Sequence, residues 1–182
     1  MKHVLLGVTG SIAAYKAAEI ANILTKQGCE VDVILTKSAQ EFITPLTFQT
    51  LTKRKVYTKM FDEILVNEVE HISLAKRADV CVVAPATANL IGKLASGIAD
   101  DMLTTVLTAV RGTPVILCPA MNTAMYENEI VQENISRLKK HGVLFVEPKE
   151  GLLACGDLGR GALAEVETIT ETVLRYLKEK ED

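Results

Sequence analysis

Short apolar runs alternate with amphipathic segments along most of the chain. Runs rich in Val, Ile, Leu and Cys predict strands of a parallel sheet buried on both faces, at residues 2–8, 30–35, 79–84, 115–118 and 143–146. Apolar residues at helical spacing predict the helices between them, at residues 13–27, 68–77, 86–97, 99–110, a stretch ending near 140, and 165–180. Pro85 and Pro119 are expected to end the third and fourth strands. The alternation predicts an α/β domain.

Three stretches carry no clear pattern, and we expect them to be mainly loop. Residues 39–59 contain short helical turns around Pro45 and a solvated loop at 53–55, and residues 61–67 are indistinct. Residues 147–161 contain four glycines and no periodicity, after what we expect to be the last strand at 143–146. Loops of that length in a compact domain are usually functional or disordered.

Composition narrows the class of protein. With 182 residues, the chain is long enough for one domain with a full hydrophobic core, which we expect to span residues 1–182. Aromatic residues make up 4% and Trp is absent, so a base-stacking surface is disfavoured, and a net charge of -3 gives no electrostatic case for nucleic acid. The mean hydropathy of +0.21 suggests that some surface is buried between subunits.

Targeting and redox signals are few. No run approaches the roughly 18 apolar residues of a membrane span, and Gly7 and Gly10 interrupt the apolar amino terminus, so we expect a cytoplasmic protein. The four cysteines show no CxxC spacing, which argues against a zinc site and a disulfide framework. Three are expected to fill the core, at positions 29, 81 and 118. Cys155 instead lies in the glycine-rich stretch, where a thiol can meet a substrate.

The first strand–helix turn is a candidate anion site. Gly10, Ser11 and Ile12 lie where a helix begins, and free N–H groups at a helix N-terminus favour phosphate, although any short turn of this kind can show the same pattern. The Gly-x-Gly-x-x-Gly motif and the acidic residue of a dinucleotide site are missing. The second strand ends instead in Thr36-Lys37-Ser38, which suits a phosphate or a mononucleotide, so NAD is disfavoured.

Further candidates follow the third and fourth strands, because open α/β sheets bind ligands at the carboxyl ends of their strands. Thr87 and Asn89 can hydrogen-bond a ligand, and Ala120, Met121, Asn122 and Met125 suit a small organic ligand better than a metal. Asn122 can equally be a helix N-cap beside core methionines. His71 lies on a predicted helix, where a lone histidine is more often a surface residue, and Asp100 and Asp101 fit a structural role at a helix start.

Six motifs in order resemble the homo-oligomeric flavin-containing cysteine decarboxylases, in their stand-alone bacterial form. They are Gly10-Ser-Ile12, His71, Ala84-Pro-Ala-Thr-Ala-Asn89, Asp100-Asp-Met-Leu-Thr-Thr105, Pro119-Ala-Met-Asn-x-x-Met125 and Ala154-Cys-Gly-Asp157. The resemblance implies a Rossmann-like/flavodoxin-like three-layer sandwich with a mostly parallel sheet and helices on both faces. It also implies FMN as cofactor, no metal, and assembly as a trimer or a dodecamer of trimers, with the active site completed across a subunit boundary.

The implied reaction is decarboxylation of phosphopantothenoylcysteine to phosphopantetheine in coenzyme A biosynthesis. In this family FMN oxidises the substrate to a thioaldehyde, CO2 is lost, and the enethiol is reduced again, because FMN supplies the electron sink that the cysteine carboxylate lacks. The resemblance gives a catalytic role to His71 as acid/base, to Asn122 as the holder of the substrate carboxylate, and to Cys155 as proton donor on a substrate-clamp flap at about 147–165.

The resemblance also assigns the binding residues. It places the FMN phosphate at Gly10, Ser11, Ile12, Thr36 and Ser38. It lines the flavin with Thr87, Ala88, Asn89, Leu90 and Ala120. It places the substrate beside Asn122, Met125 and Ala154.

Two departures from the family pattern and several alternatives remain open. Tyr126 stands where the family usually has Trp, and Arg160 precedes Gly161 where many members have Gly-Arg-Met. A peptidyl-cysteine decarboxylase would need no reducing-step cysteine, so Cys155 argues against one. A flavin prenyltransferase-like enzyme would lack the Pro-x-Met-Asn motif. A non-catalytic FMN-binding regulatory protein and a flavodoxin-like electron carrier are the alternatives from other classes.

Overall fold

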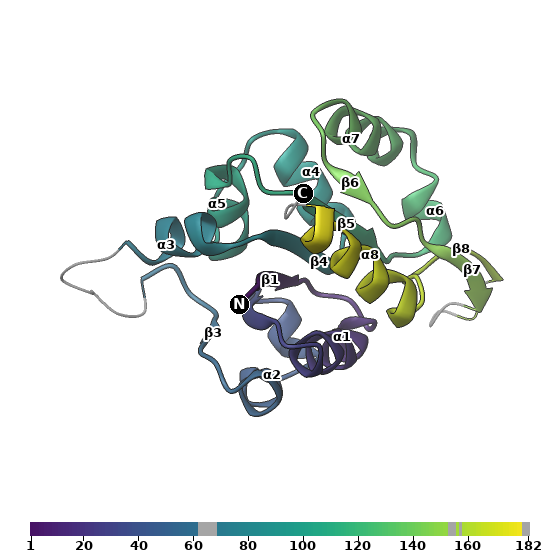
Figure 1. The fold of residues 1–182 in the computed structure, drawn as a ribbon. Coiled ribbons are helices and arrows are strands. Elements are labelled where there is room, and N and C mark those ends of the chain that lie inside the picture. Colours follow the sequence, from purple (N-terminus) through teal and green to yellow (C-terminus); the bar gives the residue numbers. More distant parts are fainter. Residues whose placement is uncertain (62–68, 153–155, 157, 180–182) are drawn as a thin grey trace.

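A parallel six-stranded sheet lies at the centre of the computed structural model, which describes residues 1–61, 69–152, 156 and 158–179 (Figure 1). The strand order is β3-β2-β1-β4-β5-β6, and each strand is parallel to its neighbours. The strands are β1 (His3–Val8), β2 (Glu30–Leu35), β3 (Val56–Tyr57), β4 (Val80–Ala86), β5 (Val115–Pro119) and β6 (Leu144–Phe145).

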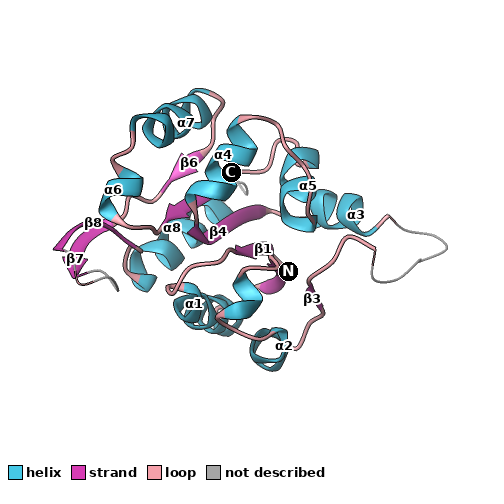
Figure 2. Ribbon diagram, turned by 180° about the vertical axis from the view of Figure 1, so that it is seen from behind, coloured by secondary structure: helices cyan, strands magenta, loops and turns pink. Residues whose placement is uncertain are grey.

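Helices cover both faces of this sheet (Figure 2). One core packs the sheet against α1, α2 and α8, and a second packs it against α3, α4, α5 and α7. Neighbouring strand residues face opposite cores, as Leu5 and Leu6 do, which explains why the strands read as continuous apolar runs. The helices are α1 (Ala14–Lys26), α2 (Pro45–Thr52), α3 (Glu70–Arg77), α4 (Ala88–Ala95), α5 (Met102–Ala109), α6 (Thr123–Tyr126), α7 (Glu129–Lys140) and α8 (Val166–Glu179), with a 3-10 turn η1 (Ala39–Glu41).

Several helices begin at side-chain caps. Thr87 accepts a hydrogen bond at the start of α4, Asp101 forms a capping box with Thr104 at the start of α5, and Asn122 and Asn128 cap α6 and α7. The predicted cap at Asn122 and the predicted structural role of Asp101 are therefore present. None of the helices in the described part of the chain is long and apolar enough to cross a membrane.

The third predicted strand runs further than expected. We predicted that Pro85 ends it, but β4 continues through Pro85 to Ala86. The Pro85 carbonyl accepts hydrogen bonds from the backbone N–H and the hydroxyl of Thr9, at 3.3 and 2.7 Å. A proline lacks a donor but keeps its acceptor, so it can remain in a strand where only the carbonyl is bonded.

The glycine-rich stretch is also more ordered than predicted. Residues 147–161 were expected to be loop after a last strand at 143–146, yet β7 (Lys149–Leu152) and β8 (Leu158–Ala162) form an antiparallel hairpin. Figure 1 shows this hairpin next to α6 at the edge of the molecule. Its sequence shows no alternation of apolar and polar residues, so pattern analysis could not find it.

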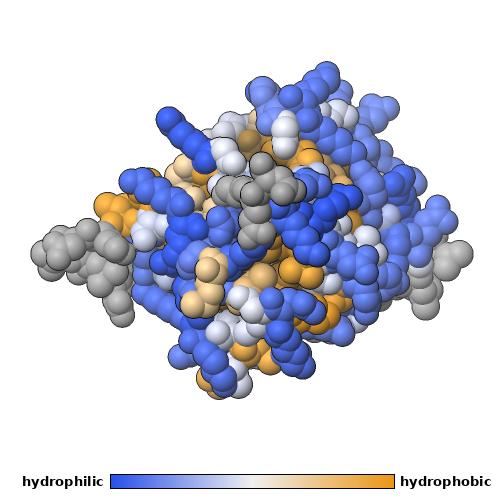
Figure 3. Space-filling view, in the orientation of Figure 1, coloured by the Kyte–Doolittle hydropathy of each residue, from blue (hydrophilic) through white to orange (hydrophobic). Residues whose placement is uncertain are grey.

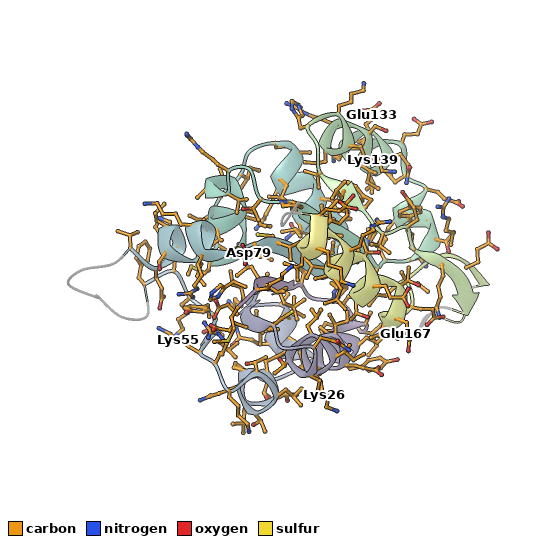
Figure 4. The ribbon with its side chains drawn as sticks, in the orientation of Figure 1. Lys26, Lys55, Asp79, Glu133, Lys139 and Glu167 are labelled. Atoms are coloured by element: carbon orange, nitrogen blue, oxygen red, sulfur yellow. The ribbon has the colours of Figure 1, made fainter. Side chains whose placement is uncertain are left out.

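The predicted solvated loop at 53–55 carries structural ion pairs instead. Arg54 donates from Nε to Asp32 Oδ1 at 2.8 Å and from Nη1 to Glu30 Oε2 at 2.5 Å, which ties the start of β3 to β2. Lys55, whose side chain Figure 4 labels, bonds Glu70 at the start of α3 at 2.5 Å. The basic run therefore fastens the sheet edge to neighbouring elements.

The surface combines a hydrophilic majority with apolar areas. Figure 3 shows one face, on which hydrophilic residues surround smaller hydrophobic areas. Large apolar side chains that are well exposed include Ile12, Tyr15, Phe42, Leu46, Phe61, Val69 and Ile130. Their burial between subunits stays a prediction.

Candidate active site

A cavity of about 610 Å³ lies where the crossovers from β1 and β4 turn in opposite directions. Ligands of open α/β sheets bind at such switch points, and this volume is in the range of small-molecule sites. The turns after β1, β2, β4 and β5 all contribute to the lining. The lining residues are Thr9, Gly10, Ser11, Thr36, Lys37, Ser38, Thr87, Ala88, Asn89, Leu90, Lys93, Asp100, Asp101, Ala120, Met121 and Met125.

One end of the cavity is built for an anion. Gly10 and Ser38 approach so closely that a Cβ on Gly10 would lie 2.4 Å from the Ser38 Cβ, so the turns after β1 and β2 form a single cradle. Helix α1 begins at Ala14 and directs its positive end toward this cradle. Ser11, Thr36 and Ser38 bring hydroxyls to the lining. The donor set fits a phosphate group.

Thr9 joins the two halves of the site. Its hydroxyl donates to the Pro85 carbonyl at 2.7 Å and accepts from the Thr87 backbone N–H at 3.1 Å. The Thr87 hydroxyl in turn accepts from Leu90 N at the start of α4, at 3.4 Å. These bonds hold the turn after β1 at a fixed distance from the turn that carries residues 87–90.

An ion pair between Lys93 and Asp100 lies farther along α4. Lys93 donates to both carboxylate oxygens of Asp100, at 2.7 and 3.0 Å, and lies 3.9 Å from Asp101. The hydrogen bond from Lys93 holds the pKa of Asp100 below its ordinary value. This part of the cavity therefore presents an ion pair, while Leu90, Ala120, Met121 and Met125 supply apolar lining.

The structure brings together most of the residues predicted to bind the cofactor. Nine of the ten line the cavity, as does Met125, which was predicted to contact substrate. Ile12 is the exception, because it is 56% exposed and is not among the lining residues.

The three predicted catalytic residues lie differently. Asn122 stands between the lining residues Met121 and Met125, and its Oδ1 accepts from Ala124 N at 2.8 Å as a helix cap. His71 lies in the first turn of α3 and does not line the cavity. Figures 1 and 2 place α3 and the β7–β8 hairpin on opposite sides of the molecule. Cys155 and Ala154 lie outside the described residues.

Sequence reasoning missed two contributors to the lining. Thr9 and Lys93 were assigned no role, and Asp100 and Asp101 were given only a structural one. Thr9 precedes Gly10 directly, so its place next to the anion turn was a usable signal. Lys93 lies one helical turn after Asn89 and Leu90, a spacing that puts it on the same side of α4.

The described cysteines have no part in this site. Burial raises the pKa of the Cys29 and Cys118 thiols, so both stay protonated near neutral pH, as expected of core residues. Over the described ranges of the chain, no group of His, Cys, Asp and Glu side chains could hold a metal ion.

Comparison with known proteins identifies the family. The model of the family described as Flavoprotein matches residues 1–178, nearly the whole chain. The chain belongs to the Flavoprotein family. This flavoprotein is 49% identical over 177 residues to a protein of Streptococcus mutans named "Probable phosphopantothenoylcysteine decarboxylase", and the match covers 97% of this chain and 99% of that relative.

A longer relative and a solved structure extend the comparison. The flavoprotein is 49% identical over 179 residues to the coenzyme A biosynthesis bifunctional protein of Bacillus subtilis, covering 98% of this chain and 44% of that protein. A solved PPC decarboxylase variant, complexed with pantothenoylaminoethenethiol, superposes with a TM-score of 0.87 at 33% identity and covers 97% of this chain and 98% of that chain. The predicted family and three-layer fold are confirmed.

Proposed function

We propose that this flavoprotein is an FMN-dependent carboxy-lyase of the cytoplasm that converts phosphopantothenoylcysteine to phosphopantetheine. The observation that carries the proposal is the end-to-end match to the Streptococcus mutans relative, joined to a cavity whose lining suits a flavin mononucleotide. Coenzyme A biosynthesis is the process in which this product is used. The chain corresponds to 44% of the bifunctional relative, so only the decarboxylase reaction is proposed for it.

FMN would be held along the whole cavity. Gly10, Ser11, Thr36 and Ser38 would take its phosphate, with Ile12 beside the turn, because hydroxyls and helix N–H groups suit that charge. The ring system would lie against residues 87–90 and Ala120, whose lining is mostly small and apolar. When bound, FMN supplies the two-electron redox chemistry that makes loss of CO2 from a cysteine carboxylate possible.

The remaining residues would act on the substrate. Asn122 would orient the substrate carboxylate next to Met125 and Ala154, a role whose benefit is geometric. His71 would move a proton during oxidation, since imidazole is the side chain most often used for general acid and base catalysis. Cys155 would donate a proton during reduction, from a flap at about 147–165 within the single domain 1–182.

A cavity completed by two copies of the chain would explain the position of His71. Within one chain His71 does not line the cavity, and α3 lies across the molecule from the hairpin that belongs to the proposed flap. His71 would therefore serve the cavity of a neighbouring subunit. Assembly as a trimer, or as a dodecamer of trimers, provides such boundaries. The exposed apolar side chains Ile12, Tyr15 and Val69 are candidates for burial there.

Mass spectrometry of the reaction tests the proposal. Purified protein is loaded with FMN and given phosphopantothenoylcysteine or, separately, a peptide with a carboxy-terminal cysteine. We expect loss of CO2 from the first and recovery of saturated phosphopantetheine. Decarboxylation of the peptide alone would instead assign a peptidyl-cysteine decarboxylase, and no uptake of FMN would contradict the cofactor.

A further inference from the structure

The two positions at which the chain departs from the family pattern are in contact. The Arg160 guanidinium carbon lies 5.5 Å from the centre of the Tyr126 ring, within the range of a cation–π interaction. Tyr126 is 5% exposed and closes α6, while Arg160 lies in β8. A tyrosine in the place of tryptophan also brings a hydroxyl, and this hydroxyl has a specific acceptor.

Glu147 is that acceptor, and it joins the pair to two further elements. Its Oε2 accepts from the Tyr126 hydroxyl at 2.6 Å and from Arg160 Nη2 at 3.2 Å. Its Oε1 accepts from Lys139 Nζ at 2.6 Å, and Figure 4 labels Lys139 on α7. Since Glu147 lies two residues before β7, one carboxylate connects both arms of the hairpin to α6 and α7.

The backbone of β8 also lies directly on α6 and on the turn that precedes it. Met121 N donates to the Gly161 carbonyl at 3.0 Å. A Cβ on Gly161 would lie 2.2 Å from the Met121 carbonyl oxygen, and one on Gly159 would lie 2.4 Å from Thr123 Oγ1. Figure 1 shows β8 and α6 side by side. The two glycines thus allow an approach that the side-chain cluster then fixes.

This contact lies against the wall of the cavity. Met121 and Met125 line the cavity, and Asn122 accepts at its carbonyl from Tyr126 N at 2.9 Å. The single turn of α6 therefore has Met125 facing the cavity and Tyr126 facing the hairpin. A shift of Tyr126 would displace Asn122 and Met125 together, because four residues give the turn no independent stability.

We propose that Tyr126, Glu147 and Arg160 are positioning residues that hold α6 and the β7–β8 hairpin in one arrangement, and so place Asn122 and Met125 for the substrate. The inference rests on the proposed function, whose substrate contacts it concerns. It assigns a role to both departures from the family pattern: the hydroxyl of Tyr126 and the charge of Arg160 meet on one carboxylate.

The charges of the cluster support this arrangement. Burial alone would raise the pKa of Glu147, but hydrogen bonds from Lys139 and Tyr126 and the nearby positive charges outweigh it, so the pKa lies below the ordinary value. The carboxylate is therefore ionised near neutral pH and accepts charge-assisted hydrogen bonds, which are shorter and stronger than neutral ones.

Kinetics of two isosteric variants test the proposal. Tyr126→Phe removes one hydroxyl and Glu147→Gln removes one charge, and we expect each to lower kcat about tenfold while FMN affinity stays within about twofold. The double variant should lose little more than either single variant, because the residues act as one unit. Glu133→Gln, on the exposed side of α7, is the matched control and should keep the wild-type kcat.

Amide hydrogen exchange provides a readout that is independent of activity. The Met121 N–H, bonded to Gly161, should exchange at least about tenfold faster in Tyr126→Phe and Glu147→Gln than in wild type. An unchanged kcat, additive losses, or a parallel fall of FMN affinity would overturn the positioning role. If wild-type protein releases no CO2 while the exchange difference is present, the proposed function fails and the link between hairpin and α6 stands.

Discussion

Gly10 sets the distance between the two turns that form the proposed phosphate end of the cavity. A side chain there would meet Ser38 Cβ at 2.4 Å and the Ser38 carbonyl carbon at 3.0 Å, so one turn would have to move. We therefore expect Gly10→Ala to weaken FMN binding by about a hundredfold, measured by quenching of flavin fluorescence, a loss of about 3 kcal/mol.

Gly92→Ala is the matched control for this substitution. Gly92 lies within α4, and a Cβ there would meet only Asn134 Nδ2 at 3.8 Å. FMN affinity should be unchanged, and the free energy of unfolding should rise by about 0.5–1 kcal/mol because alanine favours a helix interior. Equal FMN affinity in Gly10→Ala and Gly92→Ala would contradict the cradle.

Tyr126 should make the free energy of unfolding fall as the pH rises into the alkaline range. Burial, with the hydrogen bond to Glu147 and its charge, raises the pKa of Tyr126 from 10.0 to about 12. Folding favours the neutral phenol, so its contribution is complete below about pH 10 and is lost as pH rises toward 12. Between about pH 9 and about pH 11, urea unfolding of wild type should lose about 1 kcal/mol more than that of Tyr126→Phe. Parallel losses in the two proteins would contradict the raised pKa.

Local motifs made the residues of the site predictable to different degrees. Gly10, Thr36 and Thr87 follow strands that the sequence identifies, so their convergence at one sheet edge could be predicted. Lys93 joins them because it lies one helical turn after Asn89 and Leu90 on α4, and this spacing was not used to predict it. The contact between Tyr126 and Arg160 links residues 34 positions apart, as the two residue numbers show, and no pattern predicts such a pairing.

At the scale of elements, the edge of the sheet depends on one buried carboxylate. Asp32 is 4% exposed and accepts from Arg54 Nε at 2.8 Å and from Arg77 Nε at 2.9 Å, which joins β2 to the start of β3 and to α3. Arg77 also reaches the Tyr57 hydroxyl at 3.5 Å. Asp32 is the buried member, since the Arg54 and Arg77 side chains are 27% and 31% exposed, and its removal would leave two partly buried guanidinium groups without a counter-charge.

Asp32→Asn should therefore destabilise the protein by about 3 kcal/mol, measured by urea unfolding. Glu30→Gln removes a charge from the same strand, but the Glu30 side chain is 25% exposed, and we expect a loss below about 1 kcal/mol. The two carboxylates differ in burial and in their partners, because Asp32 bonds both Arg54 and Arg77 whereas Glu30 bonds Arg54. Equal losses would show that Asp32 does not anchor this edge.

Strands buried on both faces were the elements most open to prediction, because continuous apolar runs identify them without a partner. β2 was predicted with its observed bounds. β7 and β8 were missed because three glycines lie in their nine residues, and their pairing depends on contact with α6. Pro85 was misjudged for a related reason, since its place in β4 depends on Thr9 in a different strand.

At the scale of the whole molecule, the proposed sharing of active sites predicts complementation. His71→Gln removes a residue that would act in a neighbouring cavity, whereas Asn122→Asp would repel the substrate carboxylate in its own cavity. Each variant should be inactive alone. The two variants are then mixed in equal amounts, unfolded and refolded together. About a quarter of the random subunit boundaries should combine an intact His71 with an intact Asn122, so we expect about a quarter of wild-type activity to return.

FMN binding to each variant is the control for complementation, and both should bind it as wild type does. Sizing chromatography should show the same oligomer for both. No recovery in a mixed oligomer that binds FMN would mean that His71 and Asn122 do not act in a common site.

The return of α8 across the sheet determines which parts of the surface are available for attachment. Helix α8 follows the hairpin and ends beside the start of β1, where Lys2 donates to the Leu177 carbonyl. The strands run from this edge toward the cavity, so Lys2 and Glu179 lie at the edge opposite the cavity. A tag, a tether to a solid support or a fused protein joined near either position leaves the cavity entrance uncovered. The molecule can thus be immobilised at the edge opposite the cavity while the cavity stays open to solvent.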